Sequence, residues 1–302
     1  LSTNSVWQRV GRAGRPGLDS KGEAVLIMPS WDRKSHRYPD NSFDPINSQL
    51  SNSQALAEQI VTEVASGLST TPDQLESNMD LYLAGHQERL SSLEEVYNTM
   101  VEAGMIEEES KRKNGKLRLR LSATKLGWVA VRHMLRPETV LLCRRVIKHH
   151  RDLSFFDILL TACSTSDITP VLPVDFEELD LLSARLEAEP SFLLNSNWEK
   201  VPDLLEVEGK RLLSGIKMAL VLRAWTRTGD IEKVAERFDC YPFEVTQLLD
   251  STSRLLTAWP SLINSPEEDV PTWVHDGVAP LHERVRAIGR MVESGLNESV
   301  AT

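Results

Sequence analysis

Residues 114–121 read Asn114-Gly115-Lys116-Leu117-Arg118-Leu119-Arg120-Leu121, the clearest local pattern in this sequence of 302 residues. An Asn-Gly pair favours the tight turn of a β-hairpin, because both positions of such a turn adopt a left-handed backbone. The residues after the pair alternate between basic and apolar, which is the period of a strand with one buried face. The sequence therefore predicts a hairpin whose outward face carries Lys116, Arg118 and Arg120.

Two helices are predicted before this hairpin. In the first, Leu56, Ile60 and Val64 share one face. In the second, apolar residues recur with helical spacing from Leu93 to Val101. Two helices followed by a basic hairpin is the order of a winged-helix module, which we expect over residues 51–136.

The charges of the chain are unevenly distributed. The whole sequence carries 34 Lys and Arg against 44 Asp and Glu, a net charge of −10, but residues 110–151 alone hold thirteen basic residues and one acid. A basic segment in an acidic chain is typical of a surface that binds anions such as phosphates. The same charges also fit a solvated surface, or a strand edge that they protect from aggregation, and the sequence leaves these alternatives open. The candidate phosphate contacts are Arg112, Lys116, Arg118 and Arg120.

The residues after Pro137 are predicted to be helical to the end of the sequence, with loops marked by prolines. The most informative helix runs from Phe243 to Trp259. Its apolar residues recur at helical spacing and predict a buried stripe. A second, polar stripe of Gln247, Ser251 and Arg254 is a candidate binding surface, although most such stripes face water.

Residues 22–28 form a short apolar run that predicts a buried strand. Residues 31–47 are rich in Pro, Asp, Asn and Ser and predict a connector. A single strand cannot satisfy its own edges, so we expect residues 1–50 to be the tail of a larger sheet domain. The expected fold is mainly α, with this remnant of an α/β lobe, then the winged-helix module, then a helical bundle over residues 137–302.

Composition narrows the class of protein. Apolar residues make up 41% and charged residues 26%, which is typical of a globular chain and excludes a collagen-like one. No stretch has the apolar length of a membrane span, and the N-terminus lacks a signal pattern. Three cysteines lie far apart, at Cys143, Cys163 and Cys240. Their small, odd number indicates a reducing location, in the cytoplasm or associated with the nucleoid. None of them are spaced closely enough to form a metal-binding pair.

The sharpest motif is Gln8-Arg9-Val10-Gly11-Arg12-Ala13-Gly14-Arg15-Pro16-Gly17. Arg12 and Arg15 are three residues apart, so they lie on one side of a helical turn, and the glycines let the backbone approach a crowded phosphate. Forked guanidinium groups of this kind neutralise charge that develops on a γ-phosphate. Taken alone, the motif indicates a basic, glycine-rich loop.

As a pattern, Q-x-x-G-R-x-G-R followed by P-G-x-D resembles the last conserved motif of superfamily 2 helicases, in the superkiller-type (Ski-like) branch. Asp44-Pro45-Ile46 resembles that family's connector to its winged helix, and Thr124-Lys125-Leu126-Gly127 resembles the end of that module. The stretches from Met218 to Trp225 and from Ile231 to Phe238 resemble the helical bundle of the archaeal fork-unwinding DNA helicases and of helicase Q.

The resemblance implies a role for three residues of the motif. Gln8 would contact the nucleotide. Arg12 and Arg15 would contact its γ-phosphate, with Arg15 as the arginine finger. The second RecA-like lobe of such an enzyme would therefore end within residues 1–50.

The resemblance also implies that the helix from Phe243 to Trp259 is the ratchet, which lies across the translocating single strand. Gln247 and Arg254 stand where the archaeal enzymes carry a base-contacting Arg and a stacking Trp. An arginine also stacks on bases. With the register shifted by one turn, Trp259 would be the stacking residue, although a core position suits this aromatic better.

The sequence contains no G-x-x-x-x-G-K-[ST] loop and no D-E-x-H box, so the chain alone is not expected to hydrolyse ATP. Our main hypothesis is the C-terminal part of an ATP-dependent 3′-to-5′ DNA helicase, whose upstream RecA-like lobes hold most of the ATP and Mg²⁺. Its other partner would be single-stranded or forked DNA, with no membrane involved. Two alternatives stay open: an RNA helicase of the same branch, and a non-enzymatic winged-helix protein that binds DNA.

Overall fold

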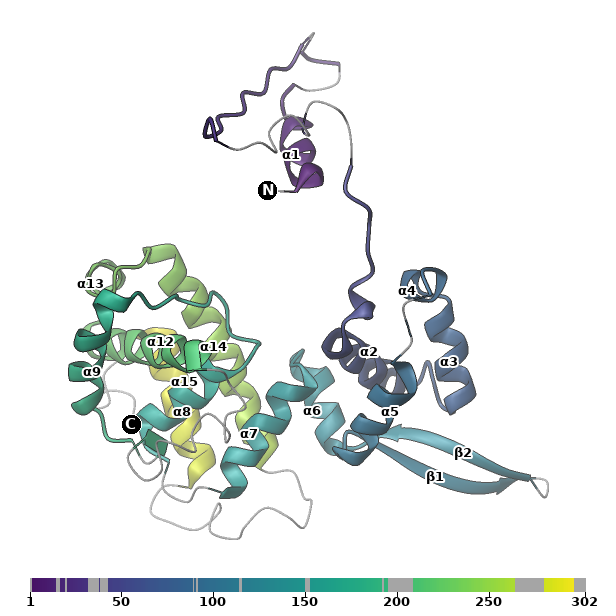
Figure 1. Cartoon of the computed structure of the whole chain (residues 1–302). Helices are drawn as coiled ribbons and strands as arrows, with labels where there is room; N and C mark the ends of the chain where they lie inside the picture. Colours follow the sequence, from purple (N-terminus) through teal and green to yellow (C-terminus); the bar gives the residue numbers. More distant parts are fainter. Residues whose placement is uncertain are drawn as a thin grey trace. The chain divides into compact units, whose positions relative to one another are not determined.

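The computed structural model describes most of the chain and forms two compact units, residues 1–48 and residues 49–302. It is mainly helical, as predicted, with one sheet of two strands among the described residues (Figure 1). No helix in this described part is both long and apolar enough to cross a membrane. The described residues are 2–14, 17–19, 21–31, 38, 43–88, 90, 92–113, 116–149, 153–191, 193–194, 209–263 and 280–295.

The first unit contains the helix α1 (Thr3–Val10) and extended segments. The strand predicted for residues 22–28 is wrong here, because this segment has no regular structure in the described chain. Val25 is 86% exposed and Ile27 is 92% exposed. A strand needs a neighbour that pairs with its backbone groups, and the described residues of this unit supply none.

The second unit begins with a part that we call the hairpin module, residues 49–133. The two strands of the predicted hairpin are confirmed, while its Asn114-Gly115 turn lies outside the described residues. The two predicted helices before it correspond to α2 and α5. The short α3 was missed, because only Leu75 and Met79 of this helix are buried and leave little periodicity to detect. The module comprises η2 (Gln49–Ser51), α2 (Ser53–Ser66), α3 (Pro72–Asp80), α4 (Leu83–His86), α5 (Leu93–Glu102), β1 (Ile106–Lys113), β2 (Lys116–Ala123) and α6 (Lys125–His133).

The two strands are antiparallel, with Ile106 opposite Ala123 and Lys113 opposite Lys116. Thr124 closes the hairpin onto α6, because its hydroxyl accepts from the backbone N of Gly127 at 3.1 Å and caps that helix. A side chain at Gly127 would place its Cβ 2.3 Å from the carbonyl oxygen of Met105. The T-x-x-G pattern is therefore explained by a cap and a close backbone approach.

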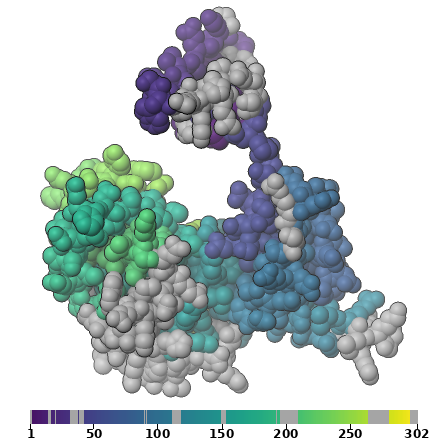
Figure 2. All heavy atoms as spheres, in the orientation of Figure 1, coloured from purple at the N-terminus to yellow at the C-terminus, as the bar shows by residue number. Residues whose placement is uncertain are grey.

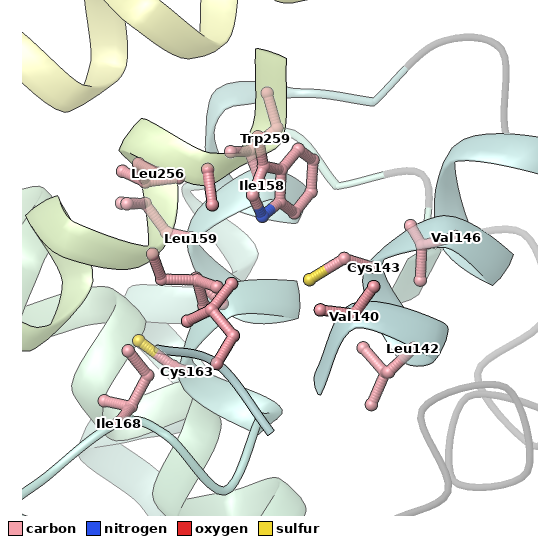
Figure 3. Packing of buried hydrophobic residues seen from close by; sticks show 14 of the residues in the cluster. Val140, Leu142, Cys143, Val146, Ile158, Leu159, Cys163, Ile168, Leu256 and Trp259 are labelled. Atoms are coloured by element: carbon pink, nitrogen blue, oxygen red, sulfur yellow. The ribbon is translucent and has the colours of Figure 1, made fainter. Parts of the chain in front are cut away.

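The remaining elements form the helical part of the second unit. Here α12 packs along α8 and α14 packs along α15 (Figure 1). Its core includes Cys143 of α7, Ile158 of α8 and Trp259 of α14 (Figure 3). The elements are α7 (Pro137–His149), α8 (Phe155–Ser164), η3 (Phe176–Glu178), α9 (Leu179–Glu187), α12 (Gly209–Thr228), α13 (Ile231–Arg237), α14 (Pro242–Ile263) and α15 (Leu281–Ser294).

The helix α14 lies at the centre of this arrangement. It contacts α7, α8, α12, α13 and α15 of the helical part and also α6 of the hairpin module. It continues through Pro260 to Ile263, past the end at Trp259 that we predicted. The hairpin module and the helical part therefore share one core along α14.

Asp157 organises the start of α8 from a fully buried position. One of its carboxylate oxygens accepts from the backbone N of Ser154 at 2.8 Å. The other accepts from the hydroxyl of Ser191 at 2.5 Å and from the backbone N of Leu193 at 3.2 Å. The carboxylate thereby joins the helix start to a distant loop.

We predict that Asp157→Ala lowers the free energy of unfolding by about 3 kcal/mol, because it leaves several buried donors without an acceptor. Chemical denaturation followed by circular dichroism measures the change. Asp175→Ala is the matched control, since Asp175 forms a similar capping box at η3 but is exposed. Its loss should be clearly smaller, and equal losses would contradict the role given to the buried network.

Candidate functional site

The helix α1, which carries the start of the glycine-rich motif, is tied down by Asp44. The Oδ2 atom of Asp44 accepts from the backbone N of Thr3 at 2.7 Å. Asn4 and Asp44 bond reciprocally, with Asn4 Nδ2 donating to Asp44 O at 3.0 Å and Asp44 N donating to Asn4 Oδ1 at 3.1 Å. A carboxylate beside the first turn also suits the positive end of the helix dipole. The connector residue Asp44 thus fixes the start of the motif helix.

Trp7 provides a second tie. Its indole nitrogen donates to the carbonyl oxygen of Tyr38 at 2.8 Å. Its ring lies tilted against that of Phe43, with ring centres 6.2 Å apart. Gln8 and Arg9, the next two residues of α1, remain exposed. The helix is therefore held so that Gln8 is available to a ligand.

Two glycines shape the loop after α1. Gly14 has a φ of +86°, and a Cβ added to Gly22 would lie 2.2 Å from the carbonyl oxygen of Ala13. Only glycine lets the chain at residue 22 pass this close to the loop. Arg12 is exposed in the loop. Arg15, the candidate arginine finger, lies outside the described residues.

The exposed groups of this loop suit an anionic ligand. Arg12 is exposed and makes no ion pair with any residue that the structure describes, so its guanidinium is available to a phosphate. Gln8 lines a cavity of about 570 Å³ together with Trp7 and Asp44. In the described ranges, no group of three or more His, Cys, Asp or Glu could hold a metal ion. Gln8 and Arg12 thus present an amide and a guanidinium on the surface, groups that suit an anionic ligand.

On the hairpin, Arg118 and Arg120 of β2 are both exposed, as predicted. Lys111 stands opposite Arg118, but Glu109 stands opposite Arg120. Residues directly opposite in an antiparallel pair share a face. Arg120 therefore lies beside an acid, and Arg118 is the better candidate for a phosphate contact.

The four candidate residues of the hairpin do not form one set. Arg112 is paired with Leu117, in the positions that alternate with those of Arg118 and Arg120. Its place in the strand is therefore on the other face of the pair. The side chains of Arg112 and Lys116 lie outside the described residues.

On α14, Gln247 and Arg254 are exposed, as predicted. Ser251 is buried instead, and its hydroxyl donates to the carbonyl oxygen of Thr169 at 2.9 Å. The expectation of a single polar stripe is corrected at this residue, because the loop at Thr169 covers it. Trp259 is 0% exposed and lies in the core beside Cys143 (Figure 3), so it cannot stack on a nucleic acid.

The exposed face of α14 carries two residues that the sequence analysis missed. Phe243 is 63% exposed, and Asp250 is also exposed. With Gln247 and Arg254 they follow the spacing i, i+4, i+7 and i+11 of one helix face. We name this set the α14 stripe. The spacing of Phe243 from Gln247 is the signal in the sequence, although Phe243 stands at the predicted start of the helix.

No protein-family model matches the chain. Among curated proteins, it is similar to archaeal proteins named ATP-dependent DNA helicase Hel308. It is 26% identical over 276 residues to that of Caldivirga maquilingensis, 27% over 259 residues to that of Methanocella arvoryzae and 28% over 223 residues to that of Aeropyrum pernix. These matches cover 83%, 82% and 72% of this chain but 34%, 33% and 28% of the relatives. The chain thus spans about a third of the length of these relatives.

We predict that Asp44→Ala speeds amide hydrogen exchange at the start of α1 by roughly 2- to 30-fold, the effect of losing a helix cap. The physical reason is the lost acceptor for the backbone N of Thr3. Exchange followed by mass spectrometry measures it. Asp44→Asn, which keeps an acceptor, and Glu23→Ala, which alters an exposed acid elsewhere in the unit, should change little. Unchanged exchange in Asp44→Ala would show that Asp44 does not hold the helix.

Proposed function

Because this chain is similar over about four fifths of its length to the Hel308 helicases of superfamily 2, we propose that it is the C-terminal part of an ATP-dependent 3′-to-5′ DNA helicase. The observation that carries the proposal is that residues of the helicase-like motif are exposed at and just after α1, in a chain whose relatives are named helicases. That helix exposes Gln8 and is followed by an exposed Arg12. The relatives are named as DNA helicases, which favours DNA over RNA as the substrate.

In the proposed enzyme, residues 1–50 complete a nucleotide site at the face of a RecA-like lobe. Gln8 contacts the nucleotide, and Arg12 with Arg15 binds its γ-phosphate. ATP with Mg²⁺ would supply the γ-phosphoryl group, whose transfer to water with release of ADP drives movement. Both cofactors are held mainly by a phosphate-cradling loop that this sequence lacks.

The exposed apolar segment around Val25 and Ile27 supports the same placement. Side chains of this kind contribute stability only when they leave water, at about 25 cal/mol per Å² of apolar surface. In the proposed enzyme, the rest of the RecA-like lobe would cover these side chains.

The hairpin module would be the winged helix, which we predicted over residues 51–136, and residues 137–302 would be the ratchet bundle. Arg118 on the outward strand face is the hairpin residue best placed for the DNA backbone. The α14 stripe would meet the single strand. A ratchet must tolerate any sequence, and stacking does so because every base offers a flat face. Phe243 and Arg254 supply an aromatic ring and a guanidinium for this purpose, while Gln247 offers hydrogen bonds.

We predict that Arg15→Ala in the complete helicase lowers ATP turnover by on the order of 10³-fold or more, as the loss of an arginine finger does. ATP binding should change far less, because the remaining phosphate contacts persist. Steady-state turnover and nucleotide binding by fluorescence measure the two effects. Arg9→Ala is the matched control, since Arg9 is an exposed basic residue of α1 that stands at a variable position of the pattern. Normal turnover in Arg15→Ala would refute the assignment of the motif.

We also predict that Phe243→Ala and Arg254→Ala each reduce strand separation several-fold in that enzyme, since each removes a stacking contact of roughly 1–3 kcal/mol. DNA-stimulated ATP hydrolysis should persist, because neither residue belongs to the nucleotide site. A gel-based unwinding assay run beside an ATPase assay gives base pairs opened per ATP.

The control for these variants is Arg286→Ala, which removes an exposed arginine from α15. It should leave the ratio of unwinding to hydrolysis unchanged. If all three variants kept the wild-type ratio, the α14 stripe would be an ordinary solvated surface.

A further inference from the structure

The hairpin module is divided electrostatically along the chain. Residues 49–109 contain twelve Asp and Glu against one arginine, Arg89, whereas the basic segment begins directly afterwards. The exposed residues of α5 include Glu94, Glu95 and Glu102, and this helix contains no basic residue. In a winged-helix protein that reads DNA, the corresponding helix enters the major groove. Carboxylates in that position repel phosphates, so this face suits a different partner.

The acidic face encloses a groove between α3, α5 and the two strands. Its volume is about 570 Å³. The residues of α3 and α5 form neighbouring blue surfaces of the module in Figure 2. The groove is lined by Pro72, Leu75, Glu76, Asp80, Leu90, Leu93, Glu94, Tyr97, Asn98, Glu108 and Leu119.

The lining combines an apolar floor with an acidic rim. Leu75 is buried, and Leu90, Leu93 and Leu119 are partly exposed, so the floor offers apolar surface that a ligand could cover. None of the lining residues is basic. The acidic residues, all exposed, are Glu76, Asp80, Glu94 and Glu108.

One part of the rim is held in place. The hydroxyl of Tyr97 on α5 donates a short hydrogen bond to Glu108 on β1. Burial and the Glu108 carboxylate together raise the pKa of Tyr97 above its usual range. The bond links α5 to β1 at the edge of the groove.

We infer that this groove docks a basic segment of a partner protein that carries an apolar side chain between Lys or Arg residues. The four carboxylates complement the cations, which steers the encounter and excludes acidic partners. The leucine floor accepts the apolar side chain, whose burial supplies the affinity. The inference does not depend on the proposed helicase function, because it rests on the groove alone.

A defined peptide tests the inference with the whole chain. A short fluorescent peptide that alternates lysine and leucine should bind, as measured by fluorescence anisotropy. A peptide of equal charge that alternates lysine and serine should bind at least about tenfold more weakly, because it lacks the apolar anchor. Equal binding of the two peptides would overturn the inference, since charge alone would then account for it.

Matched variants locate the binding. Glu76→Gln combined with Glu94→Gln removes two rim charges and should weaken the lysine–leucine peptide by about tenfold. Glu58→Gln combined with Glu102→Gln removes the same net charge from exposed positions outside the groove and should change binding by less than about twofold. Leu119→Thr, which alters the floor but suits a strand, should weaken binding at least about fivefold.

Thermal unfolding of each variant shows that the fold is intact. Equal affinities in the rim and control pairs would overturn the inference. If the chain bound duplex DNA and Glu76→Gln combined with Glu94→Gln abolished that binding, nucleic acid would be the occupant of the groove and the inference would be overturned. If sedimentation showed a dimer that dissociated in the same double variant, the inference would also be overturned, because the occupant would then be a second copy of this chain.

Discussion

The burial of α14 is the constraint on which the rest of the second unit depends. Leu248, Leu255 and Trp259 on its inner side are almost or entirely inaccessible to solvent. Their neighbours come from α6, α7, α8, α12, α13 and α15, elements that lie far apart in the sequence. A change in the rotation of this one helix would move the contacts of the hairpin module and of the helical part together, since close-packed interiors transmit strain.

The same constraint determines which residues of α14 remain available for binding. From Leu255 onwards the helix is enclosed, apart from Thr257 and the partly exposed Ser261. From Pro242 to Arg254 the helix packs on one side only, so Phe243, Gln247 and Arg254 stay on the surface. A surface of this kind is anchored by a core yet free on its outer side. That is what a binding residue needs if it is to be held in a productive geometry.

The sequence predicted those elements whose structure is decided by near neighbours. Asn114-Gly115 and the alternation after it identified the hairpin. Gly67, with a φ of +76°, ends α2 in the left-handed conformation that glycine favours. The strand at residues 22–28 could not be judged in this way, because a strand depends on a partner that local sequence does not contain. The prediction that Ser251 is exposed was wrong for a related reason, since the loop at Thr169 that covers it is 82 residues away in the sequence.

The candidate sites likewise divide into features that local sequence predicts and features that depend on distant contacts. The motif at Gln8 and Arg12 was found from its pattern, but the role of Asp44 in fixing α1 required a contact across 41 residues. The acidic groove could not be found from charge alone, because its carboxylates come from α3, α5 and β1 and become a rim only when the hairpin folds against both helices.

Charge distribution then connects the two surfaces of the hairpin module. Arg118 on the outward strand face and Glu108 on the inner one belong to the same two-stranded sheet, yet they suit ligands of opposite charge. Alternate residues point to opposite faces, so Arg118 and Glu108 face apart, although Glu109 shares the outward face with Arg120 and Arg112 lies on the inner one. A short sheet can therefore present a cationic surface to a phosphate backbone and a carboxylate rim to a basic peptide at the same time. Because each ligand is repelled by the surface that binds the other, the two would not compete for one face, and binding of a partner protein at the groove would leave Arg118 free to contact DNA.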